Sequence, residues 1–324
     1  MLLATLELAA GLIVLFVGGH FLVQGATALA SLARISTAVV ALTVVAIGTS
    51  LPELAVSMDA AARGSTDMAY GNIIGSCIFN IGAILGVTAL IAPIMVQRQT
   101  IRLEYPTMVF VVCLALVLAH DAWIDRLDGG LLVLGLMFFV AWTIYIARRG
   151  VPLSASAALE RDVKRAVHLD KGAGRAWVTN LALVGAGMVA LATGAELSVA
   201  GGVTIAQTLG VEERVIGLTV IAMGTSLPEL ATCIVATRQG EQEIALGNIV
   251  GSNIFNLLGI LGLTATLFPV HIHERALALD NWVMLAFALV LFPMMLRGRR
   301  VSRLNALLLL IGFVTYMAYV VVVR

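Results

Sequence analysis

The chain has 324 residues, of which 60% are hydrophobic and only 12% charged, and its mean hydropathy is +1.01. Soluble domains carry about twice that charged fraction, so the composition excludes a soluble globular protein. The net charge of +1 does not indicate a nucleic acid or an acidic partner. Long apolar runs, in place of short alternating strands, exclude a transmembrane β-barrel.

Apolar segments long enough to cross a bilayer follow one another along the whole chain. The first has no basic residues before it and is too long for a cleaved signal, so it is predicted to be a membrane helix. The ten predicted spans are residues 3–31, 37–62, 69–94, 104–120, 128–147, 177–207, 214–237, 243–268, 276–296 and 303–323. The sequence therefore predicts an all-α polytopic membrane protein with ten transmembrane helices.

The only long polar segment, residues 148–176, is too short for a folded domain and is predicted to be a linker. It divides the chain into five-helix halves at residues 1–147 and 177–324. When the linker is placed in the cytoplasm, fifteen of the 20 lysines and arginines fall on that side. Because cytoplasmic loops carry an excess of basic residues, we expect a multi-pass protein of the cell (inner) membrane with both termini outside.

An internal repeat covers residues 44–86 and 220–262. The two segments align without a gap at an offset of 176 residues and are identical at 24 of 43 positions. The copies begin in the second and seventh spans, so five spans separate them. An odd number of spans inverts the second copy in the membrane, which is typical of secondary transporters with a binding site near the midplane.

Each copy of the repeat contains two polar islands inside apolar sequence. The first reads GTSLPE at residues 48–53 and 224–229, and the second begins with GN and continues as GSCIFN at 75–80 or GSNIFN at 251–256. Pro52 lacks an N–H, so we expect its helix to break near residues 46–49 and to free carbonyl groups at membrane depth. Such carbonyls need a protein or cavity partner, and a cation would serve.

Side chains from both copies are predicted to converge across the pseudo-two-fold axis. They all carry oxygen ligands, which suit Ca²⁺ and Na⁺ and argue against Zn²⁺ or Cu⁺. A buried acid at membrane depth is costly unless it is paired or coordinated. The pooled residues are Glu53, Glu229, Thr49, Thr225, Ser50, Ser226, Ser76, Ser252, Asn80 and Asn256.

Other polar or reactive residues are assigned to packing or to the membrane interface. His20 and Glu196 occupy matching positions but differ between the copies, so both are expected to pack or to face water. Asp59 has no acidic counterpart and is expected near an interface. The three cysteines lie in apolar segments and are expected to be buried thiols outside any disulfide framework.

The GTSLPE and GN…GSxIFN pairs resemble the two α-repeats of the cation/Ca²⁺ exchanger superfamily, specifically the prokaryotic Na⁺/Ca²⁺ exchangers. The resemblance extends over nearly the whole chain. It implies two inverted five-helix repeats, in which spans 2, 3, 7 and 8 form the ion-binding core. Spans 1 and 6 would slide across this core.

The resemblance also implies roles for individual residues. Glu53 and Glu229 match the central carboxylates that Ca²⁺ and Na⁺ share. Thr49 and Thr225 match carbonyl ligands of Ca²⁺. The positions that match outer Na⁺ carbonyls are Ala46 and Ala222, and those that match side chains around the sites are Ser50, Ser226, Ser76, Ser252, Asn80 and Asn256.

The sequence thus predicts an antiporter that exchanges Na⁺ for Ca²⁺ by alternating access, without an enzymatic activity, a cofactor or an obligate protein partner. Asn80 and Asn256 replace the acid that K⁺-dependent exchangers carry at one of these positions, so exchange is expected to be K⁺-independent. A Ca²⁺/H⁺ antiporter, which would use the same glutamates as proton carriers, is the alternative. A channel and an intramembrane acid–base enzyme are further rivals.

Overall fold

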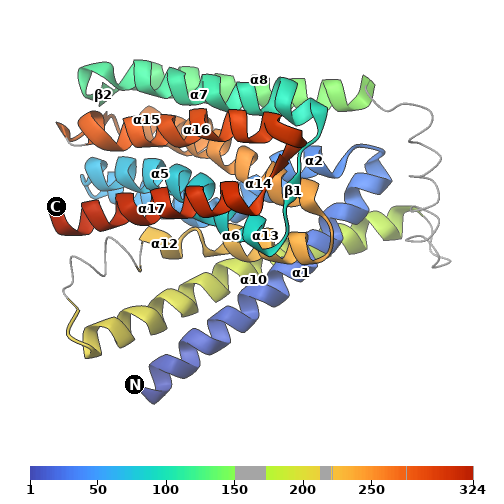
Figure 1. Cartoon of the computed structure of the whole chain (residues 1–324), viewed down its shortest axis with the longest axis horizontal. Coiled ribbons are helices and arrows are strands. Elements are labelled where there is room, and N and C mark those ends of the chain that lie inside the picture. The colour runs from blue at the N-terminus through green and yellow to red at the C-terminus, as the bar shows by residue number, and fades with distance from the viewer. Residues whose placement is uncertain (150–172, 212–219, 221, 275, 324) are drawn as a thin grey trace.

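The computed structural model describes residues 1–149, 173–211, 220, 222–274 and 276–323. Most helices run side by side, and the two long helices α1 and α10 cross the others obliquely (Figure 1). The two ends of the chain lie toward the same end of the bundle (Figure 1). An even number of membrane crossings gives this arrangement.

The helices form two series separated by residues 150–172, which lie outside the described residues and contain most of the predicted linker. The first series is α1 (Leu2–Ala33), α2 (Thr37–Val40), α3 (Ala46–Thr49), α4 (Leu51–Ala62), α5 (Thr66–Phe79), α6 (Leu85–Ile91), α7 (Tyr105–Leu118) and α8 (Arg126–Arg149). The second series is α10 (Ala173–Thr208), α12 (Ala222–Gly224), α13 (Leu227–Arg238), α14 (Gln242–Ile254), α15 (Gly262–Leu267), α16 (Asn281–Leu296) and α17 (Arg303–Val323).

Several spans continue through a wider, π-helical turn. In the first series these turns are Ala41–Val45, Asn80–Ile84 and Thr100–Glu104, and in the second they are Phe255–Leu261 and Ala276–Asp280. The turns at 100–104 and 276–280 are again 176 residues apart, outside the segments in which the sequence repeat is recognisable. The structural repeat therefore extends further along the chain than the repeated motifs.

The predicted spans agree with the described helices. Eight of these helices are long and apolar enough to cross a membrane, and the bent pair 37–49 and 51–62 makes a ninth. The remaining predicted span, 214–237, begins in residues outside the description and continues as α12 and α13. The fold is therefore the predicted all-α membrane protein of two inverted five-helix repeats.

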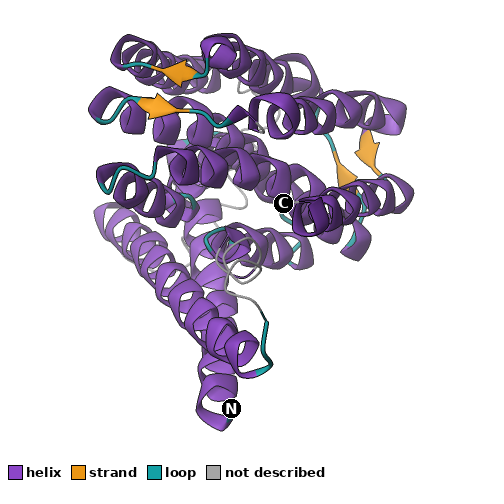
Figure 2. Ribbon diagram, turned by 90° about the vertical axis from the view of Figure 1, so that its left-hand side faces the viewer, coloured by secondary structure: helices purple, strands orange, loops and turns teal. Residues whose placement is uncertain are grey.

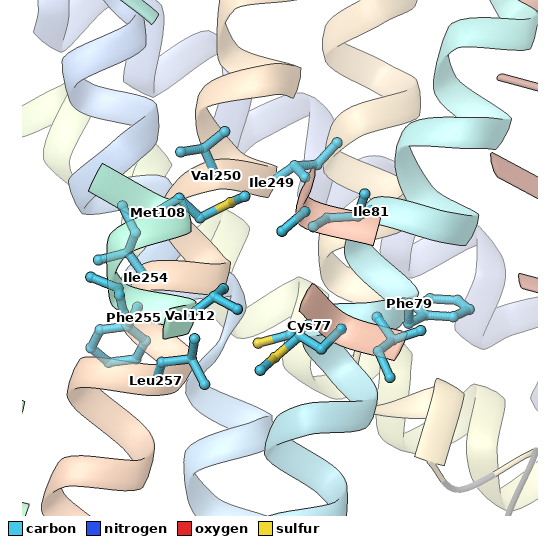
Figure 3. Packing of buried hydrophobic residues seen from close by; sticks show 14 of the residues in the cluster. Cys77, Phe79, Ile81, Met108, Val112, Ile249, Val250, Ile254, Phe255 and Leu257 are labelled. Carbon is cyan, nitrogen blue, oxygen red and sulfur yellow. The ribbon is translucent and has the colours of Figure 1, made fainter. Parts of the chain in front are cut away.

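The repeat-bearing helices lie at the centre of the bundle. The apolar centre of the span formed by α14 and α15 is completely buried and that of α5 and α6 nearly so, whereas most residues in the apolar centres of α1, α8 and α17 are not buried. Figure 3 shows Met108 of α7 near Ile254 of α14, and Cys77 of α5 belongs to the same cluster of buried side chains. The polar islands are therefore held in a close-packed interior.

The thiols follow the predicted burial only in part. Cys77 and Cys233 are buried, and all three cysteines are free. The prediction was wrong for Cys113, which is exposed on a face of α7 that none of the described helices covers.

Helices α1 and α10 pack directly against each other where glycines meet. A Cβ atom on Gly18 would lie 3.0 Å from the carbonyl oxygen of Gly187, and one on Gly187 would lie 2.9 Å from that of Gly18. A Cβ atom on Gly18 would also lie 2.8 Å from the main-chain nitrogen of Leu191, and Cβ atoms essentially never come within 3.0 Å of such a neighbour, so the two backbones approach this closely because both residues are glycine.

Two short antiparallel strand pairs join the halves. β1 (Ile94–Met95) pairs with β4 (Arg300–Val301), and β2 (Trp123–Ile124) pairs with β3 (Val270–His271). Figure 2 shows the two pairs well apart. Each pair takes one strand from each half of the chain, so the halves are connected at two places by main-chain hydrogen bonds.

Candidate ion-binding site

Two helix breaks position the acidic residues. Ser50 (φ −88°, ψ 10°) separates α3 from α4, and Ser226 (φ −93°, ψ 9°) precedes α13. The axis bends by 44° at the first of these breaks. The break lies just beyond the predicted stretch 46–49, because Pro52 occupies the first turn of the new helix, where its missing N–H costs nothing.

Glu53 and Glu229 lie in the first turns of α4 and α13. Both side chains are almost completely buried, with 1% of their surface exposed. The partial positive charge of a helix N-terminus favours a carboxylate at this position. The local fold thus compensates part of the cost of burying two acids in a membrane protein.

Each glutamate receives a hydrogen bond from the opposite half of the chain. The hydroxyl of Ser50 donates to Oε1 of Glu229 over 2.8 Å. The hydroxyl of Ser226 donates to Oε1 of Glu53, also over 2.8 Å. The hydroxyls of Ser226 and Ser76 are 3.2 Å apart, which brings α5 into the same group. The structure therefore brings these predicted residues of both repeats together.

Several buried oxygens in this region lack a protein partner. Among the described residues, the buried side-chain oxygens without a hydrogen bond include Glu53 Oε2, Glu229 Oε2, Asn80 Oδ1, Ser252 Oγ and Asn256 Oδ1. Leaving such groups unpaired costs about 1–3 kcal/mol each. All five belong to the predicted ligand set, and hard cations bind oxygen atoms of this kind. The arrangement therefore fits a cation as the missing partner.

The predicted main-chain ligands differ from the side chains, because a carbonyl group among them already has hydrogen-bond partners within its helix. The carbonyl of Ala46 accepts the N–H of Ser50 at 3.1 Å and the hydroxyl of Thr49 at 3.4 Å, so it is used within the helix in this conformation. Ala222 begins α12 at the equivalent place. Because Pro52 has no N–H, the carbonyl four residues earlier, at Gly48, loses its helical donor.

Two asparagines that sequence analysis did not include hold the threonines across the interface between the halves. Thr49 Oγ1 donates to Oδ1 of Asn248 at 3.2 Å, and Thr225 Oγ1 donates to Oδ1 of Asn72 at 3.5 Å. The amide of Asn72 also donates to the carbonyl of Glu53 at 3.3 Å. Both asparagines belong to the repeated GN dipeptide, which was the available signal.

A third asparagine was missed because it is not repeated. The amide of Asn80 donates to Oδ1 of Asn253 at 3.2 Å, and Asn253 is completely buried. Its counterpart in the first copy is Cys77, so comparison of the copies did not select it. The remaining polar residues lie away from this group: Asp59 forms an ion pair with Arg63 at 2.9 Å, and His20 and Glu196 are exposed on α1 and α10.

Comparison with known proteins gives consistent matches along the chain. The family model described as "sodium/calcium exchanger protein" matches residues 3–150 and 179–322. The inner membrane protein YrbG of Escherichia coli is 35% identical over 98% of this chain and 97% of its own. The sodium/calcium exchanger MaX1 of Methanosarcina acetivorans is 30% identical over 96% of this chain and 97% of its own.

Solved structures give the same result for the fold. Structures of the sodium-calcium exchanger NCX_Mj soaked with Na⁺ and Sr²⁺ superpose with a TM-score of 0.83 at 29% identity, covering 98% of both chains. Another, soaked with Na⁺ and Ca²⁺, has the same TM-score at 28% identity and covers all of this chain and 99% of that one.

Proposed function

Because the chain belongs to the sodium/calcium exchanger protein family, we propose that it exchanges Na⁺ for Ca²⁺ across a membrane by alternating access. The observation that carries this proposal is the buried pair Glu53 and Glu229, each of which has one carboxylate oxygen bound to the opposite half and one without a partner. Two carboxylates balance the charge of one Ca²⁺, and the surrounding ligands are oxygens.

The two carboxylates would bind Ca²⁺ and Na⁺ in turn. In this proposal the carbonyls of Thr49 and Thr225 complete the Ca²⁺ site, and those of Ala46 and Ala222 serve Na⁺. The surrounding side chains are Ser50, Ser226, Ser76, Ser252, Asn80 and Asn256, of which Ser252, Asn80 and Asn256 have unpaired buried atoms. Because the cations compete for the same carboxylates, loading with one requires release of the other, and this competition couples their movements.

The proposal includes an electrical consequence. If three Na⁺ exchange for one Ca²⁺, one net positive charge crosses the membrane in each cycle. An inside-negative potential would then drive Ca²⁺ outward, by about 2.3 kcal/mol per 100 mV. The excess of basic residues in the linker and neighbouring loops supports a cytoplasmic linker and outside termini.

The amides of Asn80 and Asn256 support K⁺-independent exchange. Both side chains are neutral and 1% exposed, so the group contains two acids rather than three. A third carboxylate would be needed to balance an additional monovalent cation bound beside Ca²⁺.

The decisive experiment is ⁴⁵Ca²⁺ uptake into liposomes that contain the purified protein. Vesicles loaded with Na⁺ are diluted into Na⁺-free buffer, with and without K⁺. We expect uptake that requires internal Na⁺ and is unchanged by K⁺. Uptake that ignores Na⁺ but follows an imposed pH gradient would replace this proposal with Ca²⁺/H⁺ antiport.

A further inference from the structure

The two halves of the structure differ in how their long helices contact the core. α1 packs along α13, where a Cβ atom on Gly19 would lie 3.4 Å from both the carbonyl oxygen of Ala231 and Cγ2 of Val235. Just beyond the C-terminal end of α13, the amide of Gln239 donates to Nδ1 of His20 over 2.8 Å. Helix α1 is therefore docked on α13 through an apolar face and one polar contact.

The equivalent face in the other half is uncovered. α10, the counterpart of α1, packs on α1, α3, α12 and α13, whereas α4, the counterpart of α13, packs on α3, α5, α15 and residues 255–261. Ala55 is exposed, although Ala231, at the same place in the repeat, is only 4% exposed. Leu51 is 44% exposed on the same face of α4. An apolar strip that one half covers thus remains open in the other.

The polar residues on this open side have complementary charges. Glu196 on α10 is the counterpart of His20, and Arg63 at the end of α4 is the counterpart of Gln239. Among the described residues, Glu196 is exposed and has no hydrogen bond or ion pair. Arg63 forms an ion pair with Asp59 on its own helix at 2.9 Å.

We propose that the exposed face of α4 is the surface on which α10 docks in the second conformation of the transporter, where the Glu196 carboxylate binds the Arg63 guanidinium. The proposal rests on alternating access, the proposed function. In the structure described, α1 is docked on α13 and His20 lies beside Gln239. If the two repeats exchange roles, α10 docks on α4, and Glu196 then lies beside Arg63. Asp59 is the other charged group on this face, so the two carboxylates compete for one guanidinium.

The charges make this contact different from the one observed. His20 and Gln239 form a hydrogen bond, whereas Glu196 and Arg63 would form an ion pair at an exposed site. The ion pair would weaken with salt, since screening acts on exposed charges. The two docked states therefore differ in salt sensitivity, and ionic strength would shift the balance between them.

Cross-linking can test the docked surface directly. The parent protein carries Cys113→Ala, because Cys113 is the exposed cysteine while Cys77 and Cys233 are buried. One variant adds Glu196→Cys with Arg63→Cys, and the matched control adds His20→Cys with Gln239→Cys. Both pairs span the region 150–172, so a protease site introduced there separates the halves unless a cross-link joins them.

We expect both pairs to be joined by a short bismaleimide or by Hg²⁺ in liposomes during exchange, and each cross-link to stop transport. Removal of Hg²⁺ with a thiol should restore it. The docking proposal is overturned if the control pair cross-links and the Glu196/Arg63 pair does not, in protein with an unchanged gel-filtration profile. If the parent shows no Na⁺-dependent ⁴⁵Ca²⁺ uptake, the proposed function fails, and the cross-links still report on docking.

Charge reversal tests the ion pair separately. Glu196→Arg and Arg63→Glu should each slow exchange by up to about fivefold, the upper end of the range for an exposed ion pair. The double variant should recover most of the rate. Asp59→Asn removes the competing carboxylate and leaves Arg63 free to bind Glu196. Of all the variants, it should therefore retain the most of the parent's salt dependence of the rate. Equal slowing in the single and double variants would contradict the pairing.

Discussion

Glu53 and Glu229 each bind a serine of the opposite half with one oxygen and leave the other oxygen free. Glutamine retains an acceptor oxygen for that serine but carries no charge. We therefore predict that Glu53→Gln and Glu229→Gln fold normally and lose Ca²⁺ exchange by roughly 100-fold or more, because removing a buried charge from its partner costs about 3 kcal/mol or more. Thermal unfolding and ⁴⁵Ca²⁺ uptake measure the two effects separately.

A matched control for these variants is Glu104→Gln. Glu104 is 4% exposed, but both of its oxygens already accept hydrogen bonds, from Gln99 at 3.1 Å and Thr100 at 2.8 Å. It should retain exchange. Full activity in either Glu53→Gln or Glu229→Gln would contradict an ion site at these carboxylates.

The hydrogen bond between Thr49 and Asn248 predicts coupling between these residues. Asn248 is completely buried, and its bond fixes the helix break of one half against α14 of the other. We predict that Asn248→Ala and Thr49→Val each raise the KM for Ca²⁺ about fivefold, corresponding to about 1 kcal/mol, and that the double variant costs little more. Thr49→Ser retains the hydroxyl and should behave like the parent. Strictly additive effects would show that the two residues act independently.

The repeat makes most of this group predictable at the residue scale. Glu53 and Glu229 stand out because an acidic residue occurs at the same position of both repeats, in similar apolar sequence. The bonds that cross between halves could not be predicted, because they depend on where two helices 176 residues apart meet. Asn253 could not be found from the repeat either, since Cys77 occupies its place in the other copy.

Among the elements, the α1–α10 crossing gives the clearest mechanical prediction. A Cβ atom on Gly187 would lie 2.7 Å from the main-chain nitrogen of Leu22, and main-chain atoms cannot move aside. Gly187→Ala should therefore destabilise the protein by about 1–3 kcal/mol. Gly185→Ala, on the same helix with nothing within 4 Å of its Cβ position, is the matched control and should be neutral or slightly stabilising. Equal melting temperatures for the two variants would show that the helices do not hold this spacing.

The elements themselves were largely predictable, because a membrane span needs a long apolar run and the chain contains ten. Their internal irregularities were predictable only in part, since Pro52 predicted a break near residues 46–49 but not its position at Ser50. The break at Ser50 follows from how Pro52 fits the first turn of α4, and the π-helical turns 80–84 and 255–261 have no single breaking residue. Such turns depend on packing against neighbouring helices, which a sequence alone does not specify.

For the whole molecule, the proposed coupling predicts a response to membrane potential. With one net charge moved per cycle, a potential of ~60 mV should change the Ca²⁺ ratio at steady state about tenfold. Valinomycin with a K⁺ gradient sets the potential in Na⁺-loaded liposomes, and ⁴⁵Ca²⁺ reports the ratio. Liposomes without valinomycin are the control. A ratio independent of potential would indicate electroneutral exchange of two Na⁺ for one Ca²⁺.

The sequence predicted the symmetry that relates the two halves, but not the conformation that they adopt. An odd number of spans between the copies predicted their inversion, but two nearly identical motifs cannot indicate which half is docked. That α1 covers α13 while α4 remains exposed is a property of one conformation. The strand pairs were also beyond prediction, since each strand has only two residues.

The reciprocal bonds of Ser50 to Glu229 and Ser226 to Glu53 bear on how such a chain could have originated. Each half therefore supplies one glutamate that accepts a hydrogen bond from the other half and one serine that donates a hydrogen bond to the other half's glutamate. Two copies of one five-helix ancestor, inserted in opposite orientations, would form both bonds as an antiparallel homodimer. Gene duplication and fusion would then have preserved a working site, and the two copies could afterwards diverge at positions such as Cys77 and Asn253.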